Sequence, residues 1–395
     1  AALGGLLKKM NGKEKWLIPI LMTLFAIGGT TYGMQEEAVA FYALIVPVMI
    51  AAGYNAMTAV LIIVLGGGVG VLASTVNPFS TGIAARTANV QLGSILWIQA
   101  LVLIAMLIIA IIFTMRYAGK VKAGKYKEDS SLASTFKALD LEAVPEYTKK
   151  RKAIMGIFAL TFIIMIISLI PWTNFHITIF EDFHAWLAGI SLFSAIIGAE
   201  HNVALGSWYF NEISALFLIS ALIIAFIYRK DFHGKNSSIT DIFIDGAEQL
   251  LSVAVIIAVA AAVSIVMRNG GIEDTIIHWG ETGLKNSNGG VVGILAYLFY
   301  LPLSFIIPSS SGLAAASMPI IAPVADLVGS TKETMVVAFA TANGLLNMIA
   351  PTIASLMAGL TLAGVSYKTW VKRVLPVMFI FVVISLVAVF VMGVI

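Results

Sequence analysis

The stretch GMQEEA, residues 33–38, places two adjacent carboxylates, Glu36 and Glu37, between two long apolar segments. The segment before it reads WLIPILMTLFAIGGTTY (16–32), and the segment after it reads VAFYALIVPVMIAAG (39–53). A carboxylate at the centre of a bilayer costs roughly 2.5–3.5 kcal/mol even on a lenient insertion scale. We therefore expect both carboxylates to line a solvated site inside the protein instead of facing lipid.

The composition predicts a polytopic helical membrane protein. Of the 395 residues, 59% are hydrophobic and 11% are charged, whereas soluble domains carry about 25% charged residues. Apolar runs near or above the spanning length of about 18 residues occur at 94–116, 153–171, 213–228, 245–267 and 374–395. The chain has no cysteine, which excludes disulfides and thiolate metal sites. Because it also lacks a nucleophile elbow and a zinc-protease motif, we expect no enzyme, no catalytic residue, no metal site and no cofactor.

The only long polar stretch, 117–152, predicts which side of the membrane is which. It holds nine Lys and Arg residues against five Asp and Glu residues. By the positive-inside rule we expect this loop to be cytoplasmic, together with 228–235 and the cluster of Lys368, Lys372 and Arg373. The basic residues flank predicted membrane segments, so they are typical of a solvated loop that sets topology, and we expect no nucleic-acid partner.

Two parts of the chain share a pattern. EEAVAFYALIVPVMIAAG (36–53) and SSGLAAASMPIIAPVADLVG (310–329) each follow an apolar run, and each contains a proline six residues before a glycine. A polar patch with a proline interrupts the next apolar segment in both copies, as STVNPFSTG (74–82) and as TANGLLNMIAPT (341–352). Counting crossings from the basic loops makes the two copies enter the membrane from opposite faces. This pattern predicts an inverted-topology repeat, the architecture of many secondary transporters.

The predicted organisation is an all-α membrane protein with two re-entrant helical hairpins and two broken helices. Residues 1–116 form the first inverted repeat, 117–152 the cytoplasmic loop, 153–236 scaffold helices and 237–395 the second repeat. The first repeat contains hairpin 16–52, broken helix 57–90 and helix 94–116. The second contains helix 239–271, hairpin 289–328, broken helix 333–367 and helix 374–395. Because the helix 239–271 has no counterpart before residue 16, we expect the natural chain to carry further membrane helices upstream, that is, an N-terminal truncation here.

Four motifs closely resemble the YfcC family: GTTYGMQEEAVAFY (29–42), STVNPFSTGIA (74–84), WYFNEISALF (208–217) and SSSGLAAASMPIIAPVADLVG (309–329). That family belongs to the anaerobic C4-dicarboxylate carrier group of the ion transporter superfamily, whose members include arginine/ornithine antiporters. The resemblance implies an elevator mechanism, a location in the bacterial cytoplasmic (inner) membrane, and a homodimer. It also implies that the hairpin tips and helix breaks bind the substrate and the coupling cation.

The candidate site residues lie at these tips and breaks. Each also has a structural alternative: Glu36 and Glu37 as complements to a helix dipole, Ser309–Ser311 as helix caps, and Pro78 and Pro351 as simple kinks. The predicted substrate-binding residues are Glu36, Glu37, Asn77, Ser80, Thr81, Ser309, Ser310, Ser311, Asn347 and Thr352. The predicted ligands of a coupling cation, Na⁺ in particular, are Thr75, Asn77, Asn343 and Asn347, with Pro78 and Pro351 as the helix breaks.

The predicted function is secondary active transport of amino acids, above all basic ones, by exchange or with coupling to Na⁺ or H⁺. Carboxylates at one tip suit a cationic group, and hydroxyls at a helix N-terminus suit a carboxylate. The main alternative is a C4-dicarboxylate carrier of the same fold. A channel or a non-transporting receptor is disfavoured, because the polar residues gather at one depth instead of lining a continuous path. The partners expected are therefore a small-molecule substrate, the lipid bilayer and a second copy of the chain.

Overall fold

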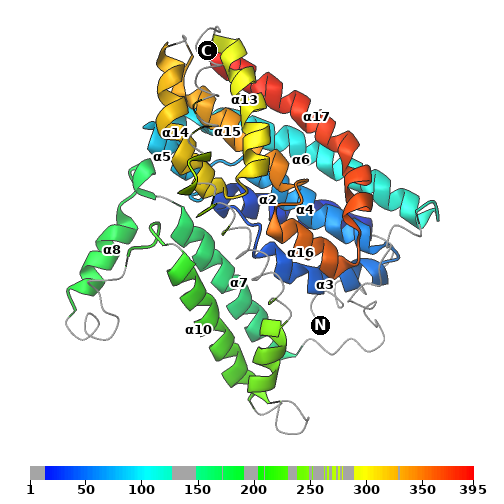
Figure 1. Ribbon diagram of the computed structural model, residues 1–395. Helices are drawn as coiled ribbons and strands as arrows, with labels where there is room; N and C mark the ends of the chain where they lie inside the picture. Colours follow the sequence, from blue (N-terminus) through cyan, green and yellow to red (C-terminus); the bar gives the residue numbers. More distant parts are fainter. Residues whose placement is uncertain are drawn as a thin grey trace. The chain divides into compact units, whose positions relative to one another are not determined.

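The computed structural model describes most of the chain, and its regular structure is helical (Figure 1). The described residues are 14–126, 148–170, 172–190, 203–208, 210–229, 238–248, 289–327 and 330–395, with isolated positions between 251 and 278. Within these ranges no β-strand occurs, which confirms the predicted all-α class. Residues 239–248 of the predicted helix 239–271 are helical. Most of the rest of that helix, the loop residues 127–147 and residue 328 of hairpin 289–328 lie outside the described residues.

The chain forms two units, one of residues 145–252 and one of residues 2–144 and 253–395. The first contains α7 (Lys149–Leu169), η2 (Trp172–Phe175), α8 (Ile179–Ala188) and α10 (Phe210–Tyr228). The second begins with η1 (Glu14–Trp16), α2 (Leu17–Tyr32), α3 (Ala38–Ala51), α4 (Ala56–Leu72), α5 (Thr81–Ala88) and α6 (Leu92–Lys122). It continues with α13 (Gly289–Ile306), α14 (Ser310–Leu327), α15 (Lys332–Asn347), α16 (Ala354–Ala363) and α17 (Tyr367–Val394).

Five of the described helices are long and apolar enough to cross a membrane: α6, α7, α10, α13 and α17. With 31 and 28 residues, α6 and α17 extend about 46 and 42 Å, more than the hydrocarbon core of about 30 Å. In contrast, α2 and α3 have 16 and 14 residues, or about 24 and 21 Å. The protein is therefore a multi-pass membrane protein in which some helices are too short to span the bilayer.

In the smaller unit, α7 and α10 pack side by side. The Thr161 hydroxyl donates to the Ser220 hydroxyl at 2.7 Å, and the rings of Phe162 and Phe217 meet edge to face at 5.3 Å. Thr148 caps the start of α7 by accepting a hydrogen bond from the Arg151 amide. Most of the remaining surface of these two helices is apolar and outward-facing, as expected of helices in contact with lipid.

The centre of the larger unit is formed by α4 and α15, which lie next to each other (Figure 1). Every residue of α4 except Val64 is buried, and α15 is buried over nearly its whole length. A helix that is hydrophobic all round belongs in the interior. The two helices approach so closely that a Cβ atom on Gly344 of α15 would overlap the Leu72 backbone. Directly after each of these two helices the chain leaves the helical conformation, and these two breaks belong to the candidate site.

A small-residue face lets α2 pack directly against α4. The sequence GGGVG (66–70) forms this face, and a Cβ on Gly70 would overlap the carbonyl oxygen of Ala26 and approach the Thr30 nitrogen to 2.8 Å. Gly29 on α2 likewise meets the carbonyl oxygen of Gly67. Small residues are what allow membrane helices to bring their backbones together. The glycines therefore serve packing, and they place the end of α2 beside the end of α4.

The two hairpins open toward different ends of the larger unit. The Lys122 ammonium contacts the Glu14 carboxylate at 3.5 Å, joining the chain before α2 to the end of α6. The Asn55 side chain, between α3 and α4, donates to the Tyr117 hydroxyl at 3.0 Å, and Arg373 near the start of α17 lies 3.9 Å over the Tyr126 ring. The open end of the α2–α3 hairpin, the end of α6 and the start of α17 thus share one end, rich in basic residues.

The α13–α14 hairpin opens at the other end of α6. The Ser94 hydroxyl, near the start of α6, donates to the Glu333 carboxylate at 3.3 Å. The Thr334 hydroxyl donates to the Met392 carbonyl at 2.9 Å, joining the start of α15 to the end of α17. Gly290, at the start of α13, lies against Phe390 of α17. The two hairpins consequently enter the larger unit from opposite ends.

Two helices are longer than the sequence pattern predicts. The apolar run 94–116 lies inside α6, which continues to Lys122 because Tyr117, Ala118 and Val121 remain buried on one face. The helix predicted for 374–395 begins at Tyr367, where Ser366 caps it by accepting from the Thr369 amide. In both cases charged residues occupy the outward-facing positions of the extra turns, so the mean hydropathy falls although the helix continues.

The close approach of α2 and α4 makes Gly70→Ala destabilising. The added Cβ would overlap the Ala26 carbonyl oxygen, and overpacking of this kind typically costs about 1–3 kcal/mol. Gly119→Ala in α6 is the matched control, since a Cβ there meets nothing within 4 Å and alanine favours helix. Thermal unfolding of the detergent-purified variants checks this. We expect a lower Tm for Gly70→Ala only, and an equal response of both variants would contradict the close contact.

Candidate functional site

The first hairpin tip is formed by residues 33–37 between α2 and α3. Gly33 adopts a left-handed conformation (φ 79°) and its amide donates to the carbonyls of Gly28 and Gly29, which ends α2. A side chain at Gly33 would also collide with the Asn77 amide, whose nitrogen would lie 2.6 Å from the added Cβ. Glycine is therefore required here both for the turn and because the break between α4 and α5 touches the tip.

Hydrogen bonds lock the end of α2 to that break. The Thr30 hydroxyl donates to the Ala73 carbonyl at 2.8 Å and accepts from the Thr75 amide at 3.0 Å. The Thr75 hydroxyl in turn lies 3.2 Å from the Thr30 carbonyl, and the Val76 amide donates to the same carbonyl at 3.2 Å. Backbone groups that leave a helix at membrane depth need such partners within the protein.

The second hairpin tip lies against α15. The Ser310 hydroxyl, at the first residue of α14, donates to the Asn343 carbonyl oxygen Oδ1 at 2.6 Å. The Asn347 amide nitrogen Nδ2 contacts Ser310 Oγ at 3.2 Å and Asn343 Oδ1 at 3.3 Å. It also donates to Gln35 Oε1 of the first tip at 3.3 Å. These four residues, Gln35, Ser310, Asn343 and Asn347, form a polar network that joins both hairpin tips through α15.

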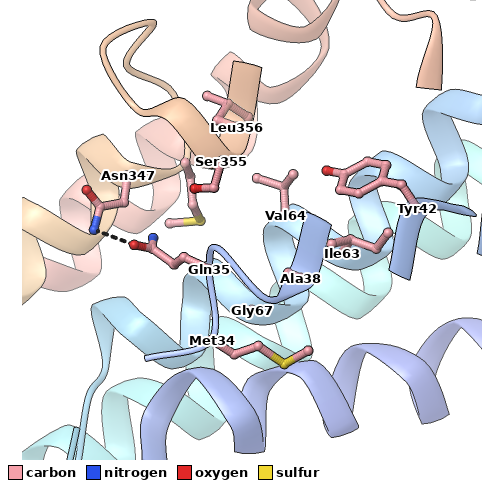
Figure 2. A pocket seen from close by; sticks show the side chains of 12 residues that line it. Met34, Gln35, Ala38, Tyr42, Ile63, Val64, Gly67, Asn347, Ser355 and Leu356 are labelled. Carbon is pink, nitrogen blue, oxygen red and sulfur yellow. Dashed lines mark hydrogen bonds between the residues drawn. The ribbon is translucent and has the colours of Figure 1, made fainter. Parts of the chain in front are cut away.

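An open cavity lies beside this network. Its polar lining comes from Gln35, Tyr42, Asn347 and Ser355, and two methionines, Met34 and Met348, border it. Figure 2 shows Gln35 and Asn347 pointing toward each other, with Ser355 and the Tyr42 hydroxyl farther along the cavity. A Cβ on Gly359 of α16 would overlap the Tyr42 ring, so the two helices hold this ring closely. The cavity is open on one side, and none of the described lining residues is charged.

Glu36 and Glu37, the two carboxylates of the first tip, directly follow Gln35. Glu36 is exposed and Glu37 is half-buried, and neither lines the cavity. The backbone carbonyls of Glu36 and Glu37 accept from the amides of Val39 and Ala40, which begin α3. Glu37 takes the N-cap position without a hydrogen bond from its side chain to that helix. The carboxylates thus stand at the entrance to α3, one residue away from the cavity wall.

The three serines of the second tip have different partners. Ser309 caps α14 by accepting from the Gly312 amide at 3.1 Å, Ser310 bonds to Asn343, and Ser311 Oγ lies 3.5 Å from Ser309 Oγ. Thr352, in the second break, donates to the Phe305 carbonyl at 3.2 Å. The residues predicted for this tip and for the second break therefore lie together in the larger unit.

The predicted residues of the first break lie where α5 begins. Asn77 accepts the Phe79 amide at 2.9 Å through its side chain, and Thr75 is bonded to Thr30. Ser80 and Thr81 are buried, and their hydroxyls have no hydrogen-bond partner among the described residues. The same holds for the buried Ser74 hydroxyl, which the sequence pattern did not single out. The first break therefore holds several buried oxygens available to a ligand.

Some of the backbone carbonyls freed by the second break have partners on α17. The Trp370 indole donates to the Met348 carbonyl at 3.0 Å, and the Tyr367 hydroxyl donates to the Ile349 carbonyl at 2.8 Å. These bonds stabilise the break around Pro351. The side-chain oxygen of Asn347, in contrast, is buried and unpaired among the described residues, as is the Asn343 amide nitrogen. The second break therefore holds free hydrogen-bonding capacity in at least these two side chains.

Sequence reasoning missed Gln35, Tyr42 and Ser355, which line the cavity. Gln35 stands inside the GMQEEA stretch, but a neutral amide gives a weaker signal than the two carboxylates that follow it. Ser355 is the second residue of α16, directly after the second break, and Tyr42 lies one turn into α3. The positions of these two side chains relative to the tips depend on how α3 and α16 pack, which no local pattern records.

Comparison with known proteins decides the family. Residues 1–394 match the family model DcuC, described as a C4-dicarboxylate anaerobic carrier. The chain belongs to the DcuC family. An uncharacterised protein of Haemophilus influenzae is 32% identical over 387 residues, covering 95% of this chain and 67% of that protein. A protein of Escherichia coli K12 named as the putative basic amino acid antiporter YfcC is 29% identical over 378 residues, covering 93% of this chain and 68% of that protein.

Among solved structures, the YdaH transporter of Alcanivorax borkumensis has a similar fold, with a TM-score of 0.52. The similarity covers 99% of this chain and 80% of that chain at 15% sequence identity, so it concerns the fold alone. Together with the family match, it shows that the protein is a membrane transporter of the DcuC and YfcC type and not an enzyme. The resemblance to the YfcC family that the motifs indicated is confirmed.

The lock between α2 and the first break predicts that Thr30→Val loosens that break. The substitution removes the hydroxyl that bonds Ala73 and Thr75, and leaving buried polar groups unpaired costs about 1–3 kcal/mol. Thr31→Val is the matched control, because the Thr31 hydroxyl bonds only to carbonyls of its own helix. Hydrogen exchange of residues 73–80 measures the effect. Faster exchange in Thr30→Val alone is expected, and equal protection in both variants would argue against the lock.

Proposed function

We propose that this transporter carries amino acids with a basic side chain, by exchange or together with a coupled cation. One observation carries the proposal: the four polar segments 33–38, 73–82, 307–313 and 343–356 contain Glu36 and Glu37 but no Lys or Arg. A cationic side chain approaching the cavity would therefore meet only negative formal charge. The name of the E. coli relative, a putative basic amino acid antiporter, agrees with this substrate class.

The geometry suggests how the two ends of such a substrate bind. The cationic side chain lies toward Glu36 and Glu37, at the entrance to α3. The α-amino and α-carboxylate groups face the neutral amides and hydroxyls of Gln35, Asn347 and Ser355 and the N-terminal turn of α14. Because helix N-termini and hydroxyls favour carboxylates, we assign Ser309–Ser311 to binding the α-carboxylate. The methionines beside the cavity contact the aliphatic part of the side chain.

A coupling cation has candidate ligands at both breaks. Hard cations such as Na⁺ prefer oxygen ligands, and the unpaired oxygens of Ser74, Ser80, Thr81 and Asn347 are buried among the described residues. Thr75 and Asn77 are also proposed ligands. Their side-chain oxygens already have hydrogen-bond partners within the protein. H⁺ is the alternative coupling ion, because one of the adjacent carboxylates Glu36 and Glu37 can hold a proton.

We propose further that α2–α6 and α13–α17 are inverted-topology repeats that work as an elevator. Both series run as hairpin, broken helix and long helix, and contacts at the two ends of α6 support opposite entry of the hairpins. In such transporters broken helices bind the substrate near the midplane. The hairpins and broken helices would move as one body, while the helices predicted at 153–236 would belong to a static scaffold and to a homodimer interface.

The proposed location is the bacterial cytoplasmic membrane, with the loop 117–152 in the cytoplasm. The contacts of Glu14, Asn55 and Arg373 gather at the end of α6 that leads into this loop. Basic residues at this end agree with the positive-inside rule.

A C4-dicarboxylate is the second candidate substrate. The family model is described by that activity, and the hydroxyls at the start of α14 together with the Gln35 and Asn347 amides are suitable donors to carboxylates. Two further negative charges beside Glu36 and Glu37 would repel, unless bound cations offset them. The choice between the two substrates therefore depends on the two glutamates.

Uptake into proteoliposomes tests the substrate. We expect labelled arginine or ornithine uptake, with or without a Na⁺ or pH gradient, and little succinate uptake. Glu36→Gln and Glu37→Gln should each lower arginine uptake at least tenfold, because they remove the charge that attracts the cationic group. Glu333→Gln, at the far end of α15, is the control and should leave uptake unchanged. Succinate uptake that survives both glutamine substitutions, with no arginine flux, would reverse the assignment in favour of the dicarboxylate.

The polar network predicts a second transport phenotype. Asn347→Leu keeps the size of the side chain but removes the contacts with Gln35, Ser310 and Asn343, each worth about 0.5–1.5 kcal/mol. We expect at least a tenfold loss of uptake in protein that still elutes as a single species. Ser385→Ala on α17, a position that does not line the cavity, should transport normally. Normal uptake by Asn347→Leu would remove this network from the substrate site.

A further inference from the structure

The helix α8 presents an exposed apolar stripe. Ile179, Phe183 and Trp186 are 65%, 52% and 61% exposed, and Ile190 just beyond the helix is 40% exposed. Their spacing of four, three and four residues puts them on one face of a helix with 3.6 residues per turn. The rings of Phe183 and Trp186 stack on each other at 5.7 Å. Four large apolar side chains thus form one continuous outward-facing stripe.

The other two faces of α8 differ from this stripe. On one of them the Phe180 ring packs against the Trp172 ring at 5.4 Å, which attaches the helix to the chain that follows α7. On the other, Asp182 and Ala185 are exposed and offer no large apolar surface. A helix with one packed face, one apolar exposed face and one polar exposed face has the pattern of a helix at a boundary between water and lipid.

The position of α8 in the chain puts it beside such a boundary. The amides of Gly206 and Trp208 donate to the Ser168 carbonyl at 2.8 and 3.3 Å, so the end of α7 lies next to the segment that leads into α10. The opposite end of α7 carries the basic residues 149–152. Trp172 and Trp208, which are typical of membrane interfaces, lie at the end of the helix pair that α8 adjoins.

Lipid is the occupant that the stripe fits best. The outward-facing surfaces of α7 and α10 are apolar, as expected of surfaces in contact with lipid, and α8 follows the end of α7 in the chain. A protein partner is disfavoured by area, because the four side chains expose roughly 400 Å², about half of the ~800 Å² per partner that a stable interface buries. Asp182 on the neighbouring face also suits water more than a protein contact.

We propose that α8 is a lipid-contacting helix, with Ile179, Phe183, Trp186 and Ile190 immersed in the apolar edge of the leaflet at the end of α7 opposite residues 149–152. The helix anchors the unit that contains α7 and α10 to this membrane surface. This inference concerns a surface outside the candidate substrate site, so it holds whichever substrate the transporter carries.

The absence of cysteine from the chain allows a direct test by site-directed spin labelling. Single cysteines are introduced by Phe183→Cys and Trp186→Cys on the stripe, and by Asp182→Cys and Ala185→Cys on the polar face as controls. Each purified full-chain variant is labelled, reconstituted into lipid nanodiscs and probed with O₂, which concentrates in lipid, and with a water-soluble nickel chelate. We expect at least a threefold higher ratio of O₂ to nickel accessibility at positions 183 and 186 than at 182 and 185.

Each outcome decides the proposal. Equal, nickel-dominated accessibility at all four positions would show that the stripe faces water, and the proposal would be wrong. Immobilised labels at 183 and 186 that are shielded from both reagents, with spin–spin coupling between copies, would show a protein interface instead. If a stripe variant fails to fold, Ile179→Cys and Ile190→Cys report on the same face with smaller changes.

Discussion

The need to satisfy every backbone polar group inside the membrane is the constraint on which this structure depends. Among the segments of the larger unit that leave the helical conformation are two hairpin tips and two helix breaks. Several of the backbone carbonyls freed there are paired within the protein. Examples are the bonds from Thr30 to the first break and from Trp370 to the second. Lipid offers no alternative partner, so tips and breaks that lie within the membrane, as we propose, need the partners that α4 and α15 bring to them.

The same constraint explains why the polar network and the candidate site coincide. Asn347 bonds to both hairpin tips, and its remaining oxygen stays buried without a partner among the described residues. A group placed to hold the tips is therefore also placed to bind a ligand that enters the cavity beside it. Under the proposed function, ligand binding and the arrangement of the tips would affect each other through one set of hydrogen bonds.

Parts of the fold and site were predictable because their signals are local. Hydropathy identified the helical membrane class, and the motifs around GMQEEA and SSSG identified the family. The glutamates were visible because charge is rare in apolar sequence. Gln35, Tyr42 and Ser355 were not visible, because neutral polar residues stand out less in apolar sequence than charged residues do. The extra turns of α6 and α17 were missed for a related reason, since averaged hydropathy falls where only one face of a helix is buried.

By itself the sequence determined that this chain is a multi-pass helical protein with two acidic residues at one turn between apolar segments. These properties follow from sums over neighbouring residues, because the cost of placing a side chain in lipid depends first on the type of that side chain. Only the tertiary structure decided that Gln35 meets Asn347 and that Thr30 meets Thr75. Such pairs form because helices pack at particular distances and rotations, and this packing depends on all the glycines and side chains between them at once.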